Sequence, residues 1–271
     1  MDLAMPFSIT KLNRLPSEIR EPLYLQLVPP SLYLSLSIDS RTLVNQRGQR
    51  VVQGIFPPDD NFACIEIKEN LEDRDWAFAC QVSLDTFMHS VHLDFVTIND
   101  PRSERYDVDT DELGHDTLFG CRSRNIGEEV RAMDAGLAPG MVRRGLGLLA
   151  EFVESLEKFT TSVGLKAVTL GALYYHNAIS WERCGFTYFR GLNLMKTIHA
   201  EFHPGGRLYQ CLDNSTPFRR PGMEMTVRGR SWTIHDSILV DAFDEDWHNP
   251  KMYKMMGKHH GVNTFPTHAH Y

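Results

Sequence analysis

The feature that most constrains the fold is an alternation of strand and helix signals in the middle of the chain, with a glycine loop inside it. Residues 144–163 have apolar side chains at helical spacing, and Gly164 follows where helices are commonly capped. Lys166 to Leu173 is short and rich in β-branched and apolar residues, which is typical of a buried central strand. A second helix over 177–184 and a strand over 186–189 follow. This order predicts an α/β unit in which a helix packs on a sheet.

The first half of the chain adds further strand signals and one early helix. A short helix is predicted over 16–28, because Pro29-Pro30 ends its apolar pattern. The acidic stretch 99–116 is predicted to be a surface loop. Six segments alternate or are rich in strand-forming residues, and they are predicted as strands: 32–38, 62–67, 76–84, 91–98, 117–122 and 128–137.

The end of the chain is less regular. Two short segments, 223–227 and 231–235, lie on either side of Arg228-Gly229-Arg230 and predict a hairpin. The tail from Trp247 onward is rich in His, Met and Lys, and we expect part of it to be disordered.

Composition narrows the functional classes. Apolar residues make up 42% of the 271 residues, enough for a full core, and the formal net charge is -7. That charge argues against nucleic-acid binding, because proteins that neutralise phosphates are usually basic. No apolar run reaches the roughly 18 residues needed to span a bilayer. The first residues lack a basic segment followed by an apolar one, so no secretory signal is expected.

The cysteines indicate a reducing compartment. Their number is odd and no Cys-x-x-Cys pair occurs, which argues against a disulfide framework and against a zinc knuckle. Most are predicted to be small buried hydrophobes. They are Cys64, Cys80, Cys121, Cys184 and Cys211. A cytoplasmic location is therefore expected.

The glycine loop Arg143-Arg144-Gly145-Leu146-Gly147 stands at the start of the predicted helix. The first helical turn leaves N–H groups unpaired, and its dipole adds partial positive charge. Glycines let the backbone approach a ligand closely, and arginines add bidentate donors. The loop therefore predicts a phosphate or pyrophosphate site. The alternative is that the glycines only ease a tight turn and that the arginines are solvated.

The loop is neither a dinucleotide fingerprint nor a P-loop, because the third glycine and the Gly-Lys-Ser/Thr are absent. It resembles the Gln/Arg-x-x-Gly-x-Gly/Ala pattern of the GNAT superfamily of acyl-CoA N-acyltransferases. Gly145 and Gly147 match the glycines, and Arg144 matches the basic residue often found before the first glycine. Val142 departs from the usual Gln or Arg.

A second segment, Asn177 to Phe186, is similar to that family's Asn-x-x-Ala…Tyr-Glu-Lys-x-Gly-Phe. The resemblance covers residues 117–191. It implies a strand that splays from the glycine-loop strand, with pantetheine in the gap. Ala135 to Leu137 and Leu170 to Ala172 would then line that gap. The residues that the resemblance implies for CoA binding are Leu137, Val142, Arg143, Arg144, Gly145, Leu146, Gly147, Leu148, Asn177 and Trp181.

Acyl transfer to an amine needs a base and is helped by an acid that protonates the thiolate. The family often supplies the acid as a Tyr where this chain has Trp181, whose indole is no proton donor at neutral pH. Tyr175 or Tyr174 would replace it, unless both are packing aromatics. Glu129, expected on the glycine-loop strand, is the candidate base, and its alternative is a solvated strand residue. Asp134 is a second candidate, on the opposite face of that strand by alternation.

Histidines offer other chemistry. His259-His260 and His268-Ala269-His270 could hold a metal, but no ligand spacing supports this, and no metal is expected. His92 and Asp94 share one face of a predicted strand, either as a polar pair in a substrate pocket or on a half-exposed sheet face.

The predicted fold class is α/β (α+β): a GNAT-like mixed, centrally splayed sheet flanked by helices. The predicted segments are an N-terminal extension 1–60, an acyl-CoA-binding core 61–195 and a C-terminal extension 196–271. The predicted function is N-acyl transfer from acetyl-CoA or a longer acyl-CoA to a small-molecule or peptide amine. The alternatives are a non-catalytic CoA-binding sensor or assembly module, and a vestigial CoA site with another ligand. A homodimer is compatible with the sequence.

Overall fold

The structure is a computed structural model that describes residues 8–85, 87–120 and 122–266. The chain divides into two compact units, each assembled from segments that are far apart in the sequence. Unit 1 comprises residues 1–102, 145–170 and 253–259, and unit 2 comprises 103–144, 171–252 and 260–271. These units cut across the three segments that were predicted from the sequence.

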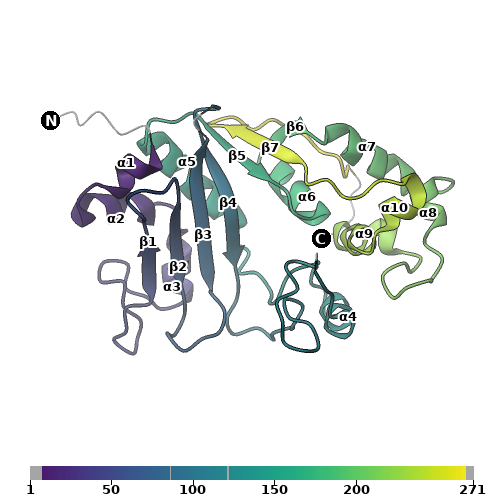
Figure 1. Cartoon of the computed structure of the whole chain (residues 1–271), viewed down its shortest axis with the longest axis horizontal. Helices are drawn as coiled ribbons and strands as arrows, with labels where there is room; N and C mark the ends of the chain where they lie inside the picture. Colours follow the sequence, from purple (N-terminus) through teal and green to yellow (C-terminus); the bar gives the residue numbers. More distant parts are fainter. Residues whose placement is uncertain (1–7, 86, 121, 267–271) are drawn as a thin grey trace. The chain divides into compact units, whose positions relative to one another are not determined.

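The strands form a seven-stranded mixed sheet, drawn in Figure 1. Their bounds are β1 Val52–Ile55, β2 Ala63–Ile67, β3 Phe78–Asp85, β4 Ser90–Ile98, β5 Ala167–Gly171, β6 Thr187–Arg190 and β7 Lys251–Met255. The strand order is β1-β2-β3-β4-β5-β7-β6. Strands β1 to β4 pair antiparallel with their neighbours, whereas β4 and β5 pair parallel. With helices flanking this sheet, the predicted α/β class is confirmed.

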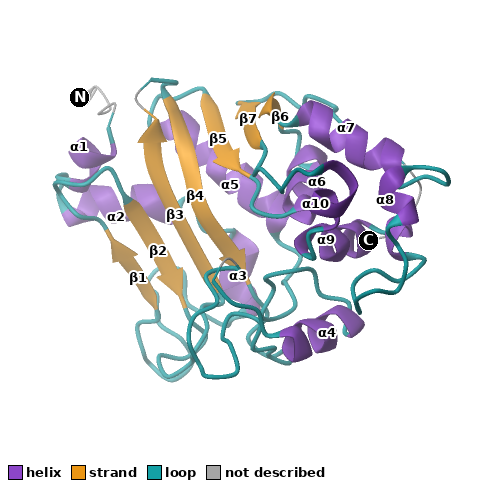
Figure 2. Ribbon diagram, turned by 45° about the vertical axis from the view of Figure 1, so that its right-hand side comes forward, coloured by secondary structure: helices purple, strands orange, loops and turns teal. Residues whose placement is uncertain are grey.

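The helices of unit 1 lie on one face of strands β1 to β4 (Figures 1 and 2). They are α1 Ile9–Asn13, α2 Ser17–Leu25, α3 Pro30–Ser35 and α5 Leu149–Ser162. The predicted apolar stripe of α5 is its buried face: Phe159 stacks on Tyr24 of α2 at 5.6 Å, and Phe152 meets Phe78 of β3 edge-on at 6.0 Å. The other face of the sheet carries half-buried polar side chains such as Gln81 and Ser83.

The strand predicted over 32–38 is wrong, because Pro30 to Ser35 form helix α3. Pro30 occupies the first helical positions, where its missing N–H costs nothing and its fixed φ favours a helix. Leu32 and Leu36 are buried whereas Leu34 between them is 82% exposed; a strand would place all three on one face, but a helix turns Leu34 away.

The parallel pairing of β4 with β5 is short. It runs from Val91↔Val168 to Leu93↔Leu170 and then stops, although β4 continues to Ile98. On the other edge of β4, the register with β3 passes from Gln81↔Phe95 to Val82↔Leu93, so Asp94 is an extra, bulged residue. Strand β4 is therefore paired with β5 up to Leu93, and this pairing stops at the residue before the bulge.

Unit 2 contains most of the remaining helices. They are α4 Ile126–Asp134, α6 Tyr175–Arg183, α7 Leu192–Glu201, α8 Arg207–Gln210, α9 Val227–His235 and α10 Ile238–Phe243, with a 3-10 helix, η1, at Met223–Met225. Trp232 of α9 is central to its core: the indole stacks on Phe218 at 5.2 Å and donates a hydrogen bond to the Leu137 carbonyl at 2.8 Å. One apolar cluster consists of Tyr106, Val108, Ala132, Leu137, Phe218 and Trp232.

Two strands predicted in this unit are wrong. The segment 128–137 is mostly helix α4, because the Asn125 side chain accepts a hydrogen bond from the Glu128 N–H and caps the helix. Acidic residues in its first turn also stabilise the helix through their interaction with the helix dipole. The segment 117–122 is a turn, in which Leu118 and Phe119 have left-handed backbones; its Cys121 lies outside the described residues.

The hairpin predicted around Arg228-Gly229-Arg230 is also wrong, because these residues lie inside helix α9. The Thr226 side chain caps that helix by accepting from the Gly229 N–H at 2.9 Å. Gly229 is a close-approach glycine: a Cβ there would lie 2.2 Å from the Met223 carbonyl oxygen. The tail after Trp247, expected to be partly disordered, contributes strand β7; His268 and His270 lie outside the described residues.

Replacing Gly229 with Ala should destabilise the protein, because the new methyl group would overlap the backbone of η1. We expect the free energy of unfolding to fall by about 1–3 kcal/mol, as for other overpacked sites. Gly127→Ala is the matched control, since that helical glycine has only a 3.9 Å neighbour. It should be neutral or stabilise by up to about 1 kcal/mol. Urea unfolding measures both; equal stability of the two variants would contradict this close approach.

Candidate functional site

The glycine loop precedes α5 and is bridged to the residue that follows β4. Gly145 forms an isolated antiparallel bridge with Asn99, and the Leu146 N–H donates to the Ile98 carbonyl at 3.4 Å. A Cβ on Gly145 would lie 3.2 Å from that same carbonyl, so the residue needs to be small. Gly147 has a left-handed backbone, with φ of 73°, and open space around its Cα. Gly145 therefore allows the close approach of the Ile98 carbonyl, and Gly147 allows a tight turn.

The start of α5 is open to a ligand. Leu148 is its N-cap and provides no capping side chain, and the first helical bond is the one that Phe152 N–H donates to Leu148 O. The N–H groups before Phe152 thus precede the helical ladder. The one acid of the first turn, Glu151, accepts a hydrogen bond from the Ser31 N–H at 2.8 Å. This helix start has the polarity and the free donors that a pyrophosphate requires.

The residues just before the loop belong to unit 2 and are tied to its backbone. Arg143 donates to the Ser103 carbonyl, and the exposed Arg144 donates to the Ala135 carbonyl at 3.3 Å. The carbonyl of Val142 accepts from the Tyr106 N–H at 2.9 Å. Of the two arginines, Arg144 is the exposed one.

The predicted lining of the gap needs correction on one side. Ala135 to Leu137 do not form the strand beside β5: Ala135 caps α4, and Leu137 is 2% exposed in the core of unit 2. The strand that pairs with β5 is β4, and the segment 103–144 stands between β4 and the glycine loop in sequence. Leu170, predicted to line the gap, is the last β5 residue paired with β4.

Asn177 lies in the first turn of α6, in unit 2. Its Oδ1 accepts from the Tyr174 N–H at 3.1 Å, and its Nδ2 lies 3.1 Å from Nε2 of His176. His176 is buried, and its Nδ1 lies 2.9 Å from the hydroxyl of Ser231. Burial, with Arg228 and His235 nearby, lowers the pKa of His176 to about 3, so its imidazole stays neutral. Asn177 therefore shapes the start of α6, through contacts that its sequence motif alone did not predict.

The aromatic residues of α6 are enclosed. Trp181 is 7% exposed and packs against Phe186 at 5.2 Å. Tyr175 is 1% exposed, and its hydroxyl makes no hydrogen bond of ordinary geometry. Burial raises the pKa of Tyr175 to about 12, although the charge of Arg230 opposes the rise. An acid role for Tyr175 would require α6 to open, since the hydroxyl does not reach the surface.

Glu129 lies on helix α4 and not on a strand, so the alternation that set Asp134 on its opposite face does not apply. The carboxylate is 3% exposed, accepts from Arg124 Nε at 3.0 Å and lies 3.4 Å from His235 Nε2. Burial raises its pKa, but the hydrogen bonds of His235 and Arg124 outweigh this and lower the pKa below its ordinary value. This environment is that of a buried ion pair, whereas a base works best with a pKa near the operating pH.

The ion pair is part of a network that the sequence did not reveal. Arg124 also donates to Asp236 at 3.0 Å, and Asp236 accepts from Arg219 at 3.1 Å and from Thr216 at 2.6 Å. The members come from α4, from α9's C-terminal end and from two loops. Because Arg124 and Asp236 are 112 positions apart, no local spacing could have indicated the pair.

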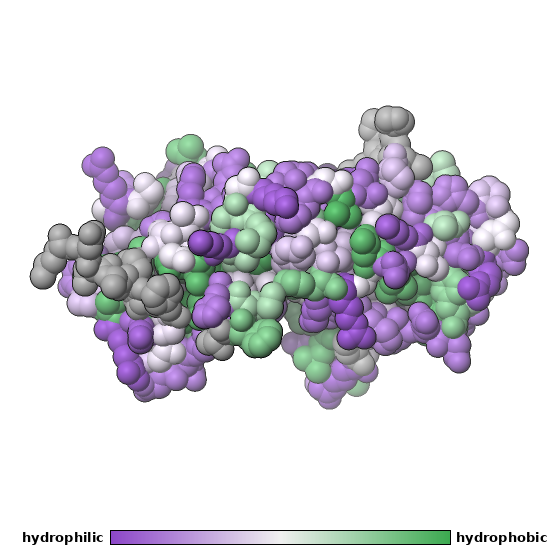
Figure 3. All heavy atoms as spheres, turned by 90° about the horizontal axis from the view of Figure 1, so that it is seen from above, coloured by the Kyte–Doolittle hydropathy of each residue, from purple (hydrophilic) through white to green (hydrophobic). Residues whose placement is uncertain are grey.

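Within the described ranges, no three His, Cys, Asp or Glu side chains gather as metal ligands would, and every helix there is too short or too polar to cross a bilayer. Figure 3 shows a face on which polar residues dominate and apolar residues form small separate patches.

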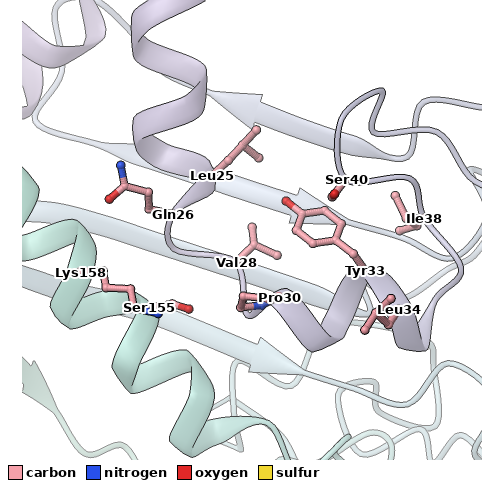
Figure 4. A pocket seen from close by; sticks show the side chains of 10 residues that line it. All are labelled: Leu25, Gln26, Val28, Pro30, Tyr33, Leu34, Ile38, Ser40, Ser155 and Lys158. Atoms are coloured by element: carbon pink, nitrogen blue, oxygen red, sulfur yellow. The ribbon is translucent and has the colours of Figure 1, made fainter.

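A pocket of about 430 Å³ lies in unit 1, between the α2–α3 connection and α5 (Figure 4). Its lining is largely apolar; Figure 4 shows Tyr33 beside Ser40, and Ser155 and Lys158 on α5. Burial raises the pKa of Tyr33 to about 12. None of the predicted site residues lines this pocket.

Comparisons with known proteins do not assign the chain to a family. The chain matches no protein-family model, and no curated protein is significantly similar to it in sequence. The likeness to the GNAT superfamily therefore rests on the residues quoted above and stays a prediction.

Glu129→Gln should destabilise the protein at neutral pH, because it leaves Arg124 buried with one carboxylate fewer. We expect a loss of about 3 kcal/mol at pH 7, as for other broken buried ion pairs. Because the pKa of Glu129 is lowered by folding, its contribution is complete above the unfolded value of about 4.3 and is lost as the pH falls through the folded value. The gap between variant and wild type should therefore shrink in acid.

Urea unfolding at pH 7 and pH 3 tests this. Asp134→Asn is the control, because Asp134 is 61% exposed and lies 3.6 Å from an exposed Arg220. Its effect should stay within about 0.5 kcal/mol. A pH-independent loss in Glu129→Gln would show that the carboxylate is not held ionised by folding.

Proposed function

We propose that this protein is an acyl-CoA-dependent N-acyltransferase that moves an acetyl or longer acyl group to an amine by direct attack. The proposal rests on one observation above all. Strand β4 pairs in parallel with β5 for three residues, the pairing stops just before the bulge at Asp94, and Gly145 of the glycine loop bridges to Asn99 just past the end of β4. The resemblance implied pantetheine between the glycine-loop strand and the strand after the helix; in this proposal β4 takes the place of that glycine-loop strand, and pyrophosphate lies at the start of α5.

The exposure of β4 supports a ligand beside it. Val91 and Leu93 are 1% and 4% exposed, as expected of a central strand. Beyond the bulge, every residue from Asp94 to Ile98 is at least partly exposed. A strand edge with unpaired backbone groups inside a sheet needs a hydrogen-bonding partner, and the amides of a pantetheine arm would provide one.

The chemistry requires one bond to form and one to break. The lone pair of an uncharged amine attacks the thioester carbonyl carbon, the C–N bond forms as the C–S bond breaks, and CoA leaves as thiolate. The proton lost by the amine goes to a base. Thiolate is a good leaving group, so the enclosed positions of Trp181 and Tyr175 do not exclude turnover.

The same enclosure favours a second candidate function, a CoA-binding sensor or assembly module without turnover. In the part of α6 that the structure describes, neither Trp181 nor Tyr175 offers an accessible acid. Both candidates share the CoA site and differ only in whether a thiol is released. We further propose a cytoplasmic location, which the four free cysteines among the described residues support.

Acetyl-CoA should raise the melting temperature. A ligand at about 100 times its Kd stabilises by about 2.7 kcal/mol, which is several degrees for a chain of this size. Arg144→Glu should abolish the shift by reversing charge beside the start of α5. Arg41→Glu, with the same charge change at an exposed site in unit 1, is the control and should keep it. Differential scanning fluorimetry with CoA, acetyl-CoA and palmitoyl-CoA measures these shifts.

The absence of a shift with any of the three ligands at millimolar concentration would exclude the CoA site. A thiol-release assay with a panel of amines then separates the two candidates. Binding without release, for every amine, would favour the sensor over the transferase.

A further inference from the structure

A polar cluster lies on β4 and β5 next to the point where they separate. His92 of β4 stands directly opposite Thr169 of β5 in the parallel register, and its Nδ1 lies 2.9 Å from the Thr169 hydroxyl. The Thr169 hydroxyl in turn lies 3.4 Å from that of Ser90. All three residues belong to unit 1.

Two members of the cluster are buried and the third is partly exposed. Ser90 and Thr169 are 0% and 6% exposed, whereas His92 is partly exposed. Since Val91 and Leu93 point into the core under α5, alternation places His92 on the opposite face, away from that helix. Among the described residues, no hydrogen bond engages Nε2 of His92. One ring nitrogen is therefore fixed and the other is available.

This geometry resembles an oriented base. If Nδ1 carries the proton and donates it to the Thr169 hydroxyl, Nε2 is left as the acceptor. The bulge at Asp94 is two residues further along the strand, a distance of about 7 Å. A thioester beside the bulge would thus lie within reach of the imidazole, directly or through one water molecule.

We propose that His92 is the general base of acyl transfer and that Thr169 is the residue that positions it; this rests on the proposed function. As the amine nitrogen bonds to the thioester carbon and the C–S bond breaks, Nε2 takes the proton from the nitrogen. The proton then passes to solvent or to the departing thiolate, which leaves the amide and CoA-SH.

Chemical modification tests the location of His92. Diethyl pyrocarbonate reacts with accessible imidazole nitrogens, and tandem mass spectrometry distinguishes His92 from His89, which is exposed at the turn before β4. Saturating acetyl-CoA should slow modification of His92 by about tenfold or more, in proportion to site occupancy. The rate at His89 should stay unchanged. Equal modification of His92 with and without acetyl-CoA overturns the proposal; if the melting shift is still present, the CoA site itself stands.

Kinetics test the two roles. With acetyl-CoA and spermidine, tyramine or free lysine as acceptor, His92→Gln should lower kcat by about 100-fold or more, the range expected for loss of a general base. The acetyl-CoA melting shift should remain. His89→Gln is the control and should keep the wild-type rate. A wild-type rate in His92→Gln, or no thiol release by the wild type with any of these amines, overturns the proposal.

Thr169→Val removes the hydroxyl with little change in shape. It should lower kcat by between about 10- and 100-fold through misplacement of the imidazole, with KM for acetyl-CoA unchanged. Thr169→Ser, which keeps the hydroxyl, should restore most of the rate. Equal rates in the Val and Ser variants would exclude the positioning role, because a purely packing role would favour Val.

Discussion

The structure depends on a backbone hydrogen-bond ladder that stops early. Three residue pairs join β4 to β5, and the pairing stops just before the bulge at Asp94. Ordinarily a central strand is paired along both edges, because unpaired backbone groups in a core are costly. Here one edge of β4 is left for another partner, and the glycine loop, bridged to Asn99, marks the end of that edge. The candidate site is a consequence of this interruption.

Much of this framework could be predicted because its signals are local. The strand over 91–98 and the buried strand after the helix are present, whereas the helix predicted over 144–163 spans Leu149–Ser162, because residues 144–148 form the glycine loop and the N-cap. What could not be predicted was which strand precedes the glycine loop. Segments that are neighbours in sequence are usually neighbours in space, so the sequence predicts that 128–137 is that strand. The segment 103–144 breaks this rule, since it belongs to unit 2 and leaves β4 as the partner of β5.

The errors in unit 2 have a common physical cause. Helices α4 and α9 contain β-branched residues and glycine, which lower helix propensity, and tertiary packing outweighs this weak local preference. Gly229 signals a turn in sequence but is required where the backbone of η1 approaches. At the site, the loop residues were predictable from their motif, whereas the contact of His92 with Thr169 joins positions 77 residues apart. A pair of this kind becomes visible only once the register of two strands is known.

The distribution of charge explains why an imidazole suits the candidate site better than a carboxylate. The chain is acidic overall, with 35 Asp and Glu against 28 Lys and Arg. In unit 2 the acids Glu129 and Asp236 form ion pairs with Arg124, and these ion pairs are part of the packing of the unit. A carboxylate with a lowered pKa is a weak base, and freeing Glu129 would leave Arg124 with Asp236 as its one remaining carboxylate among these acids. An imidazole held by a hydroxyl keeps a free nitrogen and breaks no ion pair when it gains a proton. The proposed proton acceptor is therefore an imidazole and not one of these paired carboxylates.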